Sequence, residues 1–333
     1  MPRVVLCARE AALEVSAIAE ALRARGAEPV VLDSSAFPGG ALVTLAYDGD
    51  GFRARWAGGS GDRGELHDIS AVWQSVVVGA ALPAMAPGSR ETAVAAAELA
   101  VAGLLDSLQV FQLDPYWNKA RADCKPYQLA VARRLGLDIP RTLVSNDPDA
   151  VRGFARAAGP VVTKMLVQPT GDGDTADGEA DVVFTTALGD ADLAQLDGLD
   201  LCPMIFQEQI DHRGDVRATV VGNRVFATAL DRAARGGDEL DWRRQGYAED
   251  RAPVWAPYEL PAAVADRLLR LLDHFGLNYG AADFLVARDG RHVFLELNAS
   301  GSFAFLGAGH VAPIAAAIAE VLVDPGARRV PHG

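Results

Sequence analysis

The stretch GAADFLVARDGRHVFLELN, residues 280–298, decides the fold of this chain. Two apolar runs, 281–287 and 292–298, flank Asp289-Gly290, a dipeptide typical of tight turns between paired strands. The stretch therefore predicts a β-hairpin. Side chains alternate between the two faces of a strand, so polar residues two apart share one face. This spacing places Asp283, Glu296 and Asn298 on one face of the predicted hairpin.

Two carboxylates and an amide within otherwise apolar strands are costly unless they are paired or bound to a metal ion. Oxygen ligands that face one another suit Mg²⁺, which substrate phosphates and water usually complete. We therefore predict that Asp283, Glu296 and Asn298 hold Mg²⁺. A solvated outer face of an edge hairpin accounts for the same spacing equally well, and the spacing alone leaves both interpretations open.

Upstream of this hairpin, the apolar run 203–210 predicts a strand that ends in Gln207 and Glu208 and breaks after Ile210. A strand end that leads into a hinge offers backbone groups to an adenine edge and a carboxylate to a ribose. His212 lies beside this hinge and is a candidate base, although an ordinary surface histidine is the commoner case.

A second hairpin, 215–221 and 224–231, is predicted around Gly222-Asn223. Asp215 and Arg217 alternate along its first strand, and Arg232 follows the second strand. Arginines that face a cleft bind phosphate or acyl-phosphate oxygens with two parallel hydrogen bonds. A surface ladder of ion pairs is the alternative, and such pairs contribute little.

Two lysines precede these elements. Lys125 begins a predicted helix that ends at Gly136, and Lys164 lies in the apolar run 161–166. Lysine ammonium groups bind phosphates as point charges. The glycine- and aspartate-rich segment 168–180 is predicted to be a flexible lid.

The first part of the chain predicts a parallel layer. An apolar run at 4–8, a helical pattern at 11–25 and an apolar run at 30–32 follow one another. Another strand is expected at 71–78, and Ser89 is expected to cap a helix that reaches Leu108. We predict three units, 1–115, 116–206 and 207–333, within an α/β (α+β) chain.

The composition limits the classes of protein to which this chain can belong. The net charge of −13 shows no basic excess, which disfavours a nucleic-acid partner. The three cysteines are far apart and predict neither a disulfide framework nor a metal site. No membrane segment or signal peptide is indicated, so a cytoplasmic setting without membrane contact is expected.

Taken in order, these pieces resemble the ATP-grasp superfamily. The order is Lys125, Lys164, the Gln-Glu hinge, Asp215-x-Arg217 and the triad of Asp283, Glu296 and Asn298. The segment VFLELNASGSF, 293–303, is similar to the closing metal motif of that superfamily, and 215–232 resembles RimK-type ligases. The resemblance implies an ATP-grasp fold with an N-terminal Rossmann-like pre-ATP-grasp domain.

A narrower resemblance covers roughly residues 72–322. The segments 117–148, 161–166, 206–210, LDWRR at 240–244 and 294–306 are similar to microviridin-type peptide maturases, the graspetide synthetases. The resemblance implies that ATP phosphorylates an Asp or Glu side chain of a ribosomal precursor peptide. A Thr, Ser or Lys side chain of the same peptide then closes a macrocyclic ester or amide.

The same resemblance implies roles for the matched residues. Lys125 and Lys164 would hold ATP phosphates, and Glu208 and Ile210 would border the adenine. Arg217 and Arg232 would stabilise the acyl phosphate. Arg213, Asp215 and His212 would lie near the acceptor, and Trp242 and Arg243 would border the peptide cleft. The implied cofactors are ATP and Mg²⁺, the partner is a precursor peptide with a leader and a Thr/Glu-rich core, and a homodimer is expected.

Two other functions stay open at this point. One is a different ATP-grasp ligase, RimK-like, that joins an amino acid to a peptide or small acid. The other is a module without catalytic activity that binds a nucleotide or a peptide.

Overall fold

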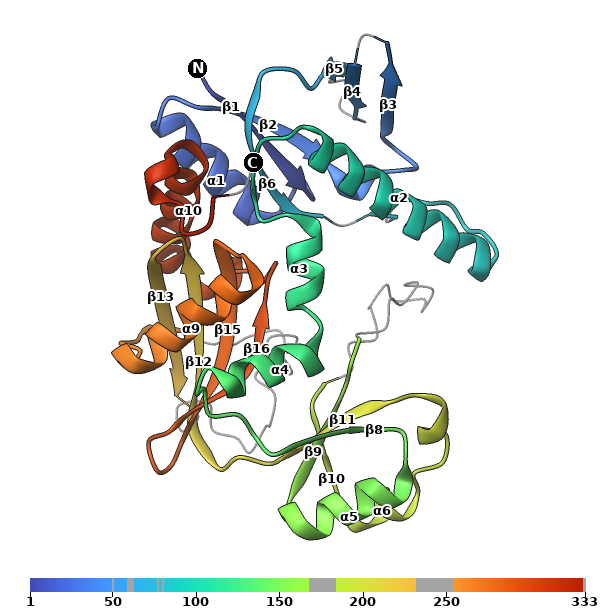
Figure 1. Cartoon of the computed structure of the whole chain (residues 1–333), viewed down its shortest axis with the longest axis vertical. Helices are drawn as coiled ribbons and strands as arrows, with labels where there is room; N and C mark the ends of the chain where they lie inside the picture. Colours follow the sequence, from blue (N-terminus) through green and yellow to red (C-terminus); the bar gives the residue numbers. More distant parts are fainter. Residues whose placement is uncertain are drawn as a thin grey trace.

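A computed structural model describes residues 1–49, 51–58, 63–76, 78–79, 81–167, 184–231 and 254–331 of the 333-residue chain. These described residues form four sheets, and the three larger ones follow one another along the long axis of the molecule (Figure 1). The mixed α/β architecture confirms the expected fold class. The predicted lid 168–180, Arg232 and the segment 240–244 lie outside the described residues.

The first sheet is parallel, as the opening pattern predicts. Its strand order is β2-β1-β6-β7, and its strands are β1 (Arg3–Ala8), β2 (Glu28–Asp33), β6 (Ile69–Ser75) and β7 (Phe111–Leu113). The helices α1 (Leu13–Ala24) and α2 (Pro87–Ser107) accompany it, with a short 3-10 turn η1 (Ser34–Ala36) after β2. A separate small sheet contains β3 (Leu42–Asp48), β4 (Gly51–Ala57) and β5 (Arg63–Glu65).

Helix α2 begins earlier than predicted. Ala86 is its N-cap residue and Pro87 is its first residue, so Ser89 lies within the first turn and is not the cap. Proline is favoured at this position because its φ angle is already helical and its missing N–H would have no partner there. The expectation of a cap at Ser89 is therefore wrong.

The second sheet is antiparallel, with strand order β10-β9-β11-β8. Its strands are β8 (Thr142–Ser145), β9 (Val161–Met165), β10 (Thr186–Leu188) and β11 (Met204–Glu208). Helix α5 (Pro148–Ala158) packs on β8 and β11, and the short α6 (Asp190–Ala194) and η2 (Leu199–Leu201) lie nearby. Asp147 caps α5 by accepting a hydrogen bond from the backbone N–H of Asp149.

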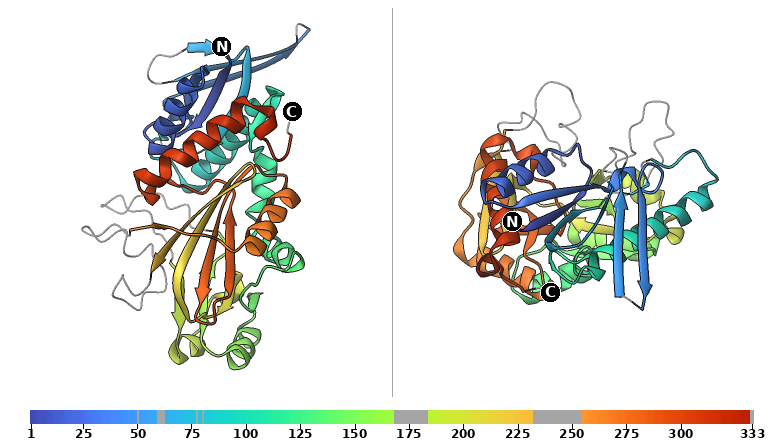
Figure 2. Two further views of the ribbon diagram at one scale, coloured as in Figure 1. Left: turned by 90° about the vertical axis from the view of Figure 1, so that its left-hand side faces the viewer. Right: turned by 90° about the horizontal axis from the view of Figure 1, so that it is seen from above.

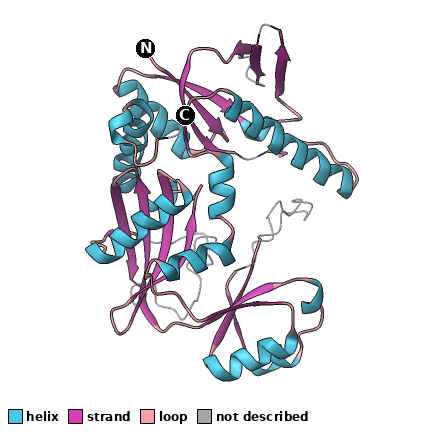
Figure 3. Cartoon of the chain, in the orientation of Figure 1, coloured by secondary structure: helices cyan, strands magenta, loops and turns pink. Residues whose placement is uncertain are grey.

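The third sheet carries both predicted hairpins. Its order is β14-β13-β12-β15-β16, and its strands are β12 (His212–Val221), β13 (Arg224–Asp231), β14 (Ala256–Pro257), β15 (Tyr279–Ala287) and β16 (His292–Asn298). The helices α3 (Tyr116–Ala122), α4 (Lys125–Arg134) and α9 (Ala262–Phe275) lie together along one side of it (Figure 3). Their apolar side chains share one core with alternate residues of β12 and β15, which leaves the polar alternate residues on the opposite face.

The last helix returns to the first sheet. Helix α10 (Ala308–Val323) lies against α1, and Ile314, Ile318 and Leu322 share a core with Ile18 and Leu22 (Figure 2). Two short 3-10 turns, η3 (Ala304–Leu306) and η4 (Pro325–Ala327), flank it. In the described part of the chain, every helix is too short or too polar to cross a lipid bilayer.

A buried polar cluster joins the first and third sheets at the start of β15; we call it the Asp114 cluster. The Asp114 carboxylate accepts hydrogen bonds from the backbone N–H groups of Asn278 (2.9 Å) and Tyr279 (2.8 Å). The nearby Lys119 ammonium donates to the backbone oxygen of Gln74 at 3.0 Å. Burial raises the pKa of Asp114 to about 7 and lowers the pKa of Lys119 to about 8. This cluster sets where β15 enters the third sheet.

Candidate active site

A cleft of about 720 Å³ lies between the second and third sheets. It is lined by β9 and β11 on one side and by β12, β15, β16 and the start of α4 on the other. The predicted site residues that line it are Lys125, Lys164, Gln207, Glu208, Ile210, His212, Asp215, Arg217, Asp283, Glu296 and Asn298. Segments more than 150 residues apart in sequence therefore meet in one cavity.

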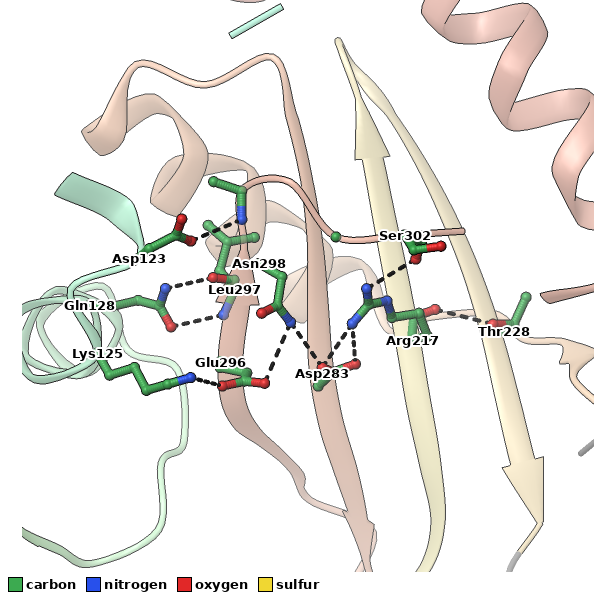
Figure 4. Close-up of polar contacts among 12 residues, drawn as sticks. Asp123, Lys125, Gln128, Arg217, Thr228, Asp283, Glu296, Leu297, Asn298 and Ser302 are labelled. Carbon is green, nitrogen blue, oxygen red and sulfur yellow. Dashed lines mark hydrogen bonds and ion pairs between the residues drawn. The ribbon is translucent and has the colours of Figure 1, made fainter. Parts of the chain in front are cut away.

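The three predicted magnesium ligands lie together. Asp283 of β15 pairs with Glu296 of β16 in register, and a bulge follows between Asp283 and Phe284. The Asn298 amide lies 3.2 Å from Asp283 Oδ2 and 3.5 Å from Glu296 Oε1 (Figure 4). Of the two explanations of the spacing, the wet outer face is excluded, because this face lines the cleft. Two carboxylates and one amide form a donor set that fits Mg²⁺.

A buried arginine is paired with the first of these carboxylates. Arg217 Nη1 donates to both oxygens of Asp283, at 2.9 and 2.8 Å, and Nη2 donates to the backbone oxygen of Ser302 at 3.1 Å. Burial lowers the pKa of Arg217, but the Asp283 carboxylate outweighs this and keeps that pKa above its usual value. Within the described residues, Nε of Arg217 has no hydrogen-bond partner. The guanidinium therefore retains a donor for an anion in the cleft.

A lysine is paired with the second carboxylate. Lys125 is the first residue of α4, and its Nζ donates to Glu296 Oε2 at 2.7 Å. Both side chains are partly exposed to the cleft, at 25% for Lys125 and 18% for Glu296. Each candidate magnesium carboxylate thus has a cation beside it.

Gln128 positions the strand that carries Glu296, and no motif in the sequence identifies it. Its amide donates to the backbone oxygen of Leu297 (2.7 Å) and accepts from the N–H of Leu297 (2.8 Å). Asp123 also accepts from the N–H of Ala299 at 3.2 Å. The start of α4 therefore supplies both a cation to the cleft and a partner for the edge strand β16 (Figure 4).

On the opposite wall, Lys164 lies on β9, opposite Ile205 of β11, and lines the cleft. Gln207 donates to the Thr142 hydroxyl at 3.0 Å, and Glu208 accepts from the N–H of Arg141 at 2.9 Å. The backbone oxygen of Ile210 lies 2.9 Å from His212 Nδ1. The predicted hinge therefore links the second and third sheets and faces the cleft.

The structure does not bring every candidate to the cleft. His212, Asp215 and Arg217 are buried on the cleft face of β12, whereas Arg213 is exposed and is not among the lining residues. A register shift between His212 and Gly214 interrupts the alternation of side chains at this point. The pKa of His292 is lowered mainly by burial and also by the positive charge of Arg213. Arg213 therefore lies near His292 and not at the cleft.

Comparisons with known proteins agree with this geometry. The model of the MvdD pre-ATP-grasp domain matches residues 9–120. Macrocyclase MdnC of Microcystis aeruginosa, solved with the precursor peptide MdnA, is 36% identical at a TM-score of 0.83, covering 97% of this chain and 100% of that one. A RiPP-associated ATP-grasp ligase of Chryseobacterium gregarium, solved with ADP and a leader and core peptide, is 26% identical at a TM-score of 0.85 over 100% of both chains.

Two further proteins are similar to this chain. The ATP-grasp ligase PsnB, solved with a minimal precursor, Mg and ADP, is 26% identical at a TM-score of 0.69, covering 96% of this chain and 98% of that one. A probable alpha-L-glutamate ligase of Teredinibacter turnerae is 30% identical over 185 residues, 54% of this chain and 56% of the relative. The chain thus spans about half the length of the curated relatives it matches.

One cleft contains the whole ordered set of Lys125, Lys164, the hinge, Arg217 and the three candidate magnesium ligands. The macrocyclase MdnC aligns with this chain along its whole length. The expected fold is thereby confirmed, including the N-terminal pre-ATP-grasp domain. The chain belongs to the family of ATP-grasp ligases that includes the RiPP macrocyclases.

Proposed function

We propose that this chain is an ATP-dependent macrocyclase of a ribosomal precursor peptide. The observation that carries the proposal is that each candidate magnesium carboxylate is paired with a cation in the cleft, Asp283 with Arg217 and Glu296 with Lys125. The macrocyclase MdnC, moreover, aligns with this chain along its whole length. The chemistry needs those groups together, because a carboxylate becomes an acyl donor only after its oxygen is phosphorylated.

ATP binding is proposed to use both walls of the cleft. Lys125 and Lys164 are the cations available for phosphate oxygens, and Gln207, Glu208 and Ile210 border the position of the adenine and ribose. When bound at Asp283, Glu296 and Asn298, Mg²⁺ supplies positive charge that stabilises the phosphate oxygens. The ion pairs with Lys125 and Arg217 hold the Glu296 and Asp283 carboxylates in place at the cleft wall.

The proposed reaction has two steps. An Asp or Glu side-chain oxygen of the peptide attacks the γ-phosphorus of ATP, and ADP leaves. A hydroxyl or amine of the same peptide then attacks the acyl carbon, the bond to phosphate breaks, and inorganic phosphate leaves carrying the proton. Arg217 lies where its Nε and its guanidinium face can stabilise the acyl phosphate, and His212 and Asp215 lie on the same wall.

Arg213 and Arg232 keep their proposed roles near the peptide on the resemblance alone. Arg213 faces away from the cleft wall, and Arg232 lies outside the described residues. The division into units 1–115, 116–206 and 207–333, the homodimer, the cytoplasmic setting and the Thr/Glu-rich core of the peptide also stay predictions.

Incubation with ATP, Mg²⁺ and the small peptide encoded beside this gene tests the proposal. The expected result is the loss of one water mass per ring, with one ADP released for each ring. An unchanged peptide mass with every neighbouring peptide, despite a folded enzyme, would contradict it.

Ligation of an amino acid is the second candidate, and the 30% identity to a probable alpha-L-glutamate ligase favours it. Its product gains the mass of an amino acid residue instead of losing water. A binding module without catalysis is the third, and it predicts no ADP with any acceptor.

A further inference from the structure

An aromatic side chain contacts the buried arginine of the cleft. Phe305 belongs to the short turn η3 and lines the same cavity as Arg217. The centroid of its ring lies 5.6 Å from the Cζ atom of Arg217, which is within the range of a cation–π contact. Phe305 is 36% exposed, whereas Arg217 is only 5% exposed. The ring therefore shields part of the guanidinium from the open cleft.

The Phe305 ring also packs against a second aromatic ring. The centroids of Phe305 and Trp255 are 5.7 Å apart and their planes meet at 62°, a favourable edge-on arrangement. Trp255 is buried, and its backbone oxygen lies 3.1 Å from Nε2 of His310 in α10. The Phe305 ring is thus constrained by two neighbours, a buried indole and the Arg217 guanidinium.

The segment that precedes Phe305 is bound to Arg217 and to α1. The backbone oxygen of Ser302 accepts a hydrogen bond from Nη2 of Arg217 at 3.1 Å (Figure 4), and the Ser302 hydroxyl donates to Glu14 Oε1. Gly301 permits this close approach, because a Cβ atom there would lie 2.5 Å from Nη2 of Arg217. These contacts fix the position of the η3 turn relative to the guanidinium.

Water competes with ring closure for an acyl phosphate. Water that attacks the acyl carbon restores the carboxylate and releases inorganic phosphate, so one ATP is consumed without a ring. An apolar side chain beside the acyl group offers water no hydrogen bond. A guanidinium that is shielded from water also attracts phosphate oxygens more strongly. Phe305 supplies both effects beside Arg217, where the acyl phosphate is proposed to lie.

We propose that Phe305 is a positioning residue that couples formation of the acyl phosphate to ring closure. The proposal rests on the proposed function. The Phe305 ring holds the Arg217 guanidinium beside the acyl phosphate, and it keeps water from the acyl carbon while the nucleophile of the peptide attacks. Phe305 thereby sets how many ATP molecules are consumed for each ring.

The experiment measures ADP released per ring formed, a ratio that reports only on folded, active molecules. In the wild type the two amounts are expected to be nearly equal. In Phe305→Ala the acyl phosphate still forms, but water captures it more often, and the ratio is expected to rise roughly 10-fold. Phe305→Leu keeps an apolar side chain without a ring and is expected to raise the ratio several-fold. Phe305→Trp keeps both properties and is expected to retain the wild-type ratio.

Trp117→Ala is the matched control, because it removes another exposed aromatic ring. Trp117 lies on α3, is 59% exposed, and is not among the residues that line the cleft. The control is expected to keep the wild-type ratio.

Hydroxylamine provides a measurement in which the variant gains a product. Its nitrogen attacks the acyl carbon, phosphate leaves, and a peptide hydroxamate forms, which mass spectrometry detects. Phe305→Ala is expected to yield several-fold more hydroxamate per ADP than the wild type, because its acyl phosphate is open to the solvent. A misfolded variant could not produce this gain.

Several outcomes would overturn the inference while the proposed function stands. They are wild-type ratios in both Phe305→Ala and Phe305→Leu, a ratio in Phe305→Trp or Trp117→Ala as high as in Phe305→Ala, loss of ADP release in Phe305→Leu, and equal hydroxamate yields. If the wild type forms no ring on any peptide, the proposed function itself fails, and the inference fails with it.

Discussion

Strand β15 carries one carboxylate contact at its start and another at its middle, and the two contacts differ in kind. At its start, the Asp114 cluster holds the backbone N–H groups of Asn278 and Tyr279, and Asp114 is only 1% exposed. Four residues further on, Asp283 is paired with Arg217 at the wall of an open cleft and is 21% exposed. The first contact holds the strand through groups that no ligand reaches. The second uses groups that nucleotide, metal and peptide can contact, so we expect it to serve the chemistry.

The largest effect is expected from Asp283→Asn, which keeps the shape of the side chain and removes its charge. Ring formation should fall by roughly 10²–10³-fold, the range for the loss of one positioned electrostatic group. Mass spectrometry of the product and the dependence of ADP release on Mg²⁺ concentration measure it. Asp289→Asn, in the exposed turn of the same hairpin, is the control and should keep wild-type activity.

Asp114→Asn should produce the opposite result. The free energy of unfolding should fall by about 2 kcal/mol at pH 5, because asparagine keeps only one of the two oxygens that accept hydrogen bonds from the buried N–H groups of Asn278 and Tyr279. Urea unfolding of the variant and wild type measures this change. Activity per folded molecule should stay near the wild-type value. An Asp114→Asn variant that is stable but inactive would contradict this contrast between the start and the middle of β15.

The pH dependence of stability sharpens the same contrast. Burial raises the pKa of Asp114 to about 7, above the unfolded value of about 3.9. The folded state therefore binds this proton more tightly, and the stability from this group is present below pH 4 and lost as the pH rises towards 7. The stability difference between wild type and Asp114→Asn should narrow across that window. A difference that widens from pH 4 to pH 7 in urea unfolding would show that the carboxylate is held in its charged form.

Lys164→Gln tests the wall opposite β15. Removal of a charged hydrogen-bond donor from the phosphates should raise the KM for ATP by roughly 10- to 100-fold, with little change in stability. The initial rate of ADP release against ATP concentration measures it. An unchanged KM would remove Lys164 from the ATP site and leave Lys125 as the phosphate lysine.

The smallest effect is expected at an exposed ion pair beside the hinge. Arg288 Nε donates to Asp211 Oδ2 at 2.8 Å, and both side chains are about 70% exposed. Arg288→Gln should change the free energy of unfolding by less than about 1 kcal/mol. Thermal unfolding at low and high salt checks this value, and a larger loss would indicate that the hinge depends on this pair.

These contrasts also explain what the sequence could predict. The hairpin of Asp283 and Glu296 and the turn at Gly222 depend on neighbours a few residues away, so local chemistry was sufficient to predict them. Gln128, Asp114 and Glu14 could not be predicted, since their partners Leu297, Asn278 and Ser302 are 164 to 288 residues away.

Arg213 shows a different limit of sequence reasoning. If side chains alternated strictly along β12, Arg213 would lie on the same face as Asp215 and Arg217. A bulge between His212 and Gly214 interrupts this alternation. No residue type in this stretch indicates the bulge from the sequence. Bulges of this kind often lie beside active sites.

The packing of α10 against α1 has a consequence for synthesis on the ribosome. The core of the first sheet combines Ile18 and Leu22 with Ile314, Ile318 and Leu322, so its last members emerge about 300 residues after its first. Contacts between residues so far apart in sequence form late, and the apolar face of α1 stays exposed until they form. The face of α1 that α10 covers should be a target for chaperones in nascent chains. A cavity of about 250 Å³, lined by Glu14 of α1 and by residues 299–303, is likewise completed only when that last segment has been made.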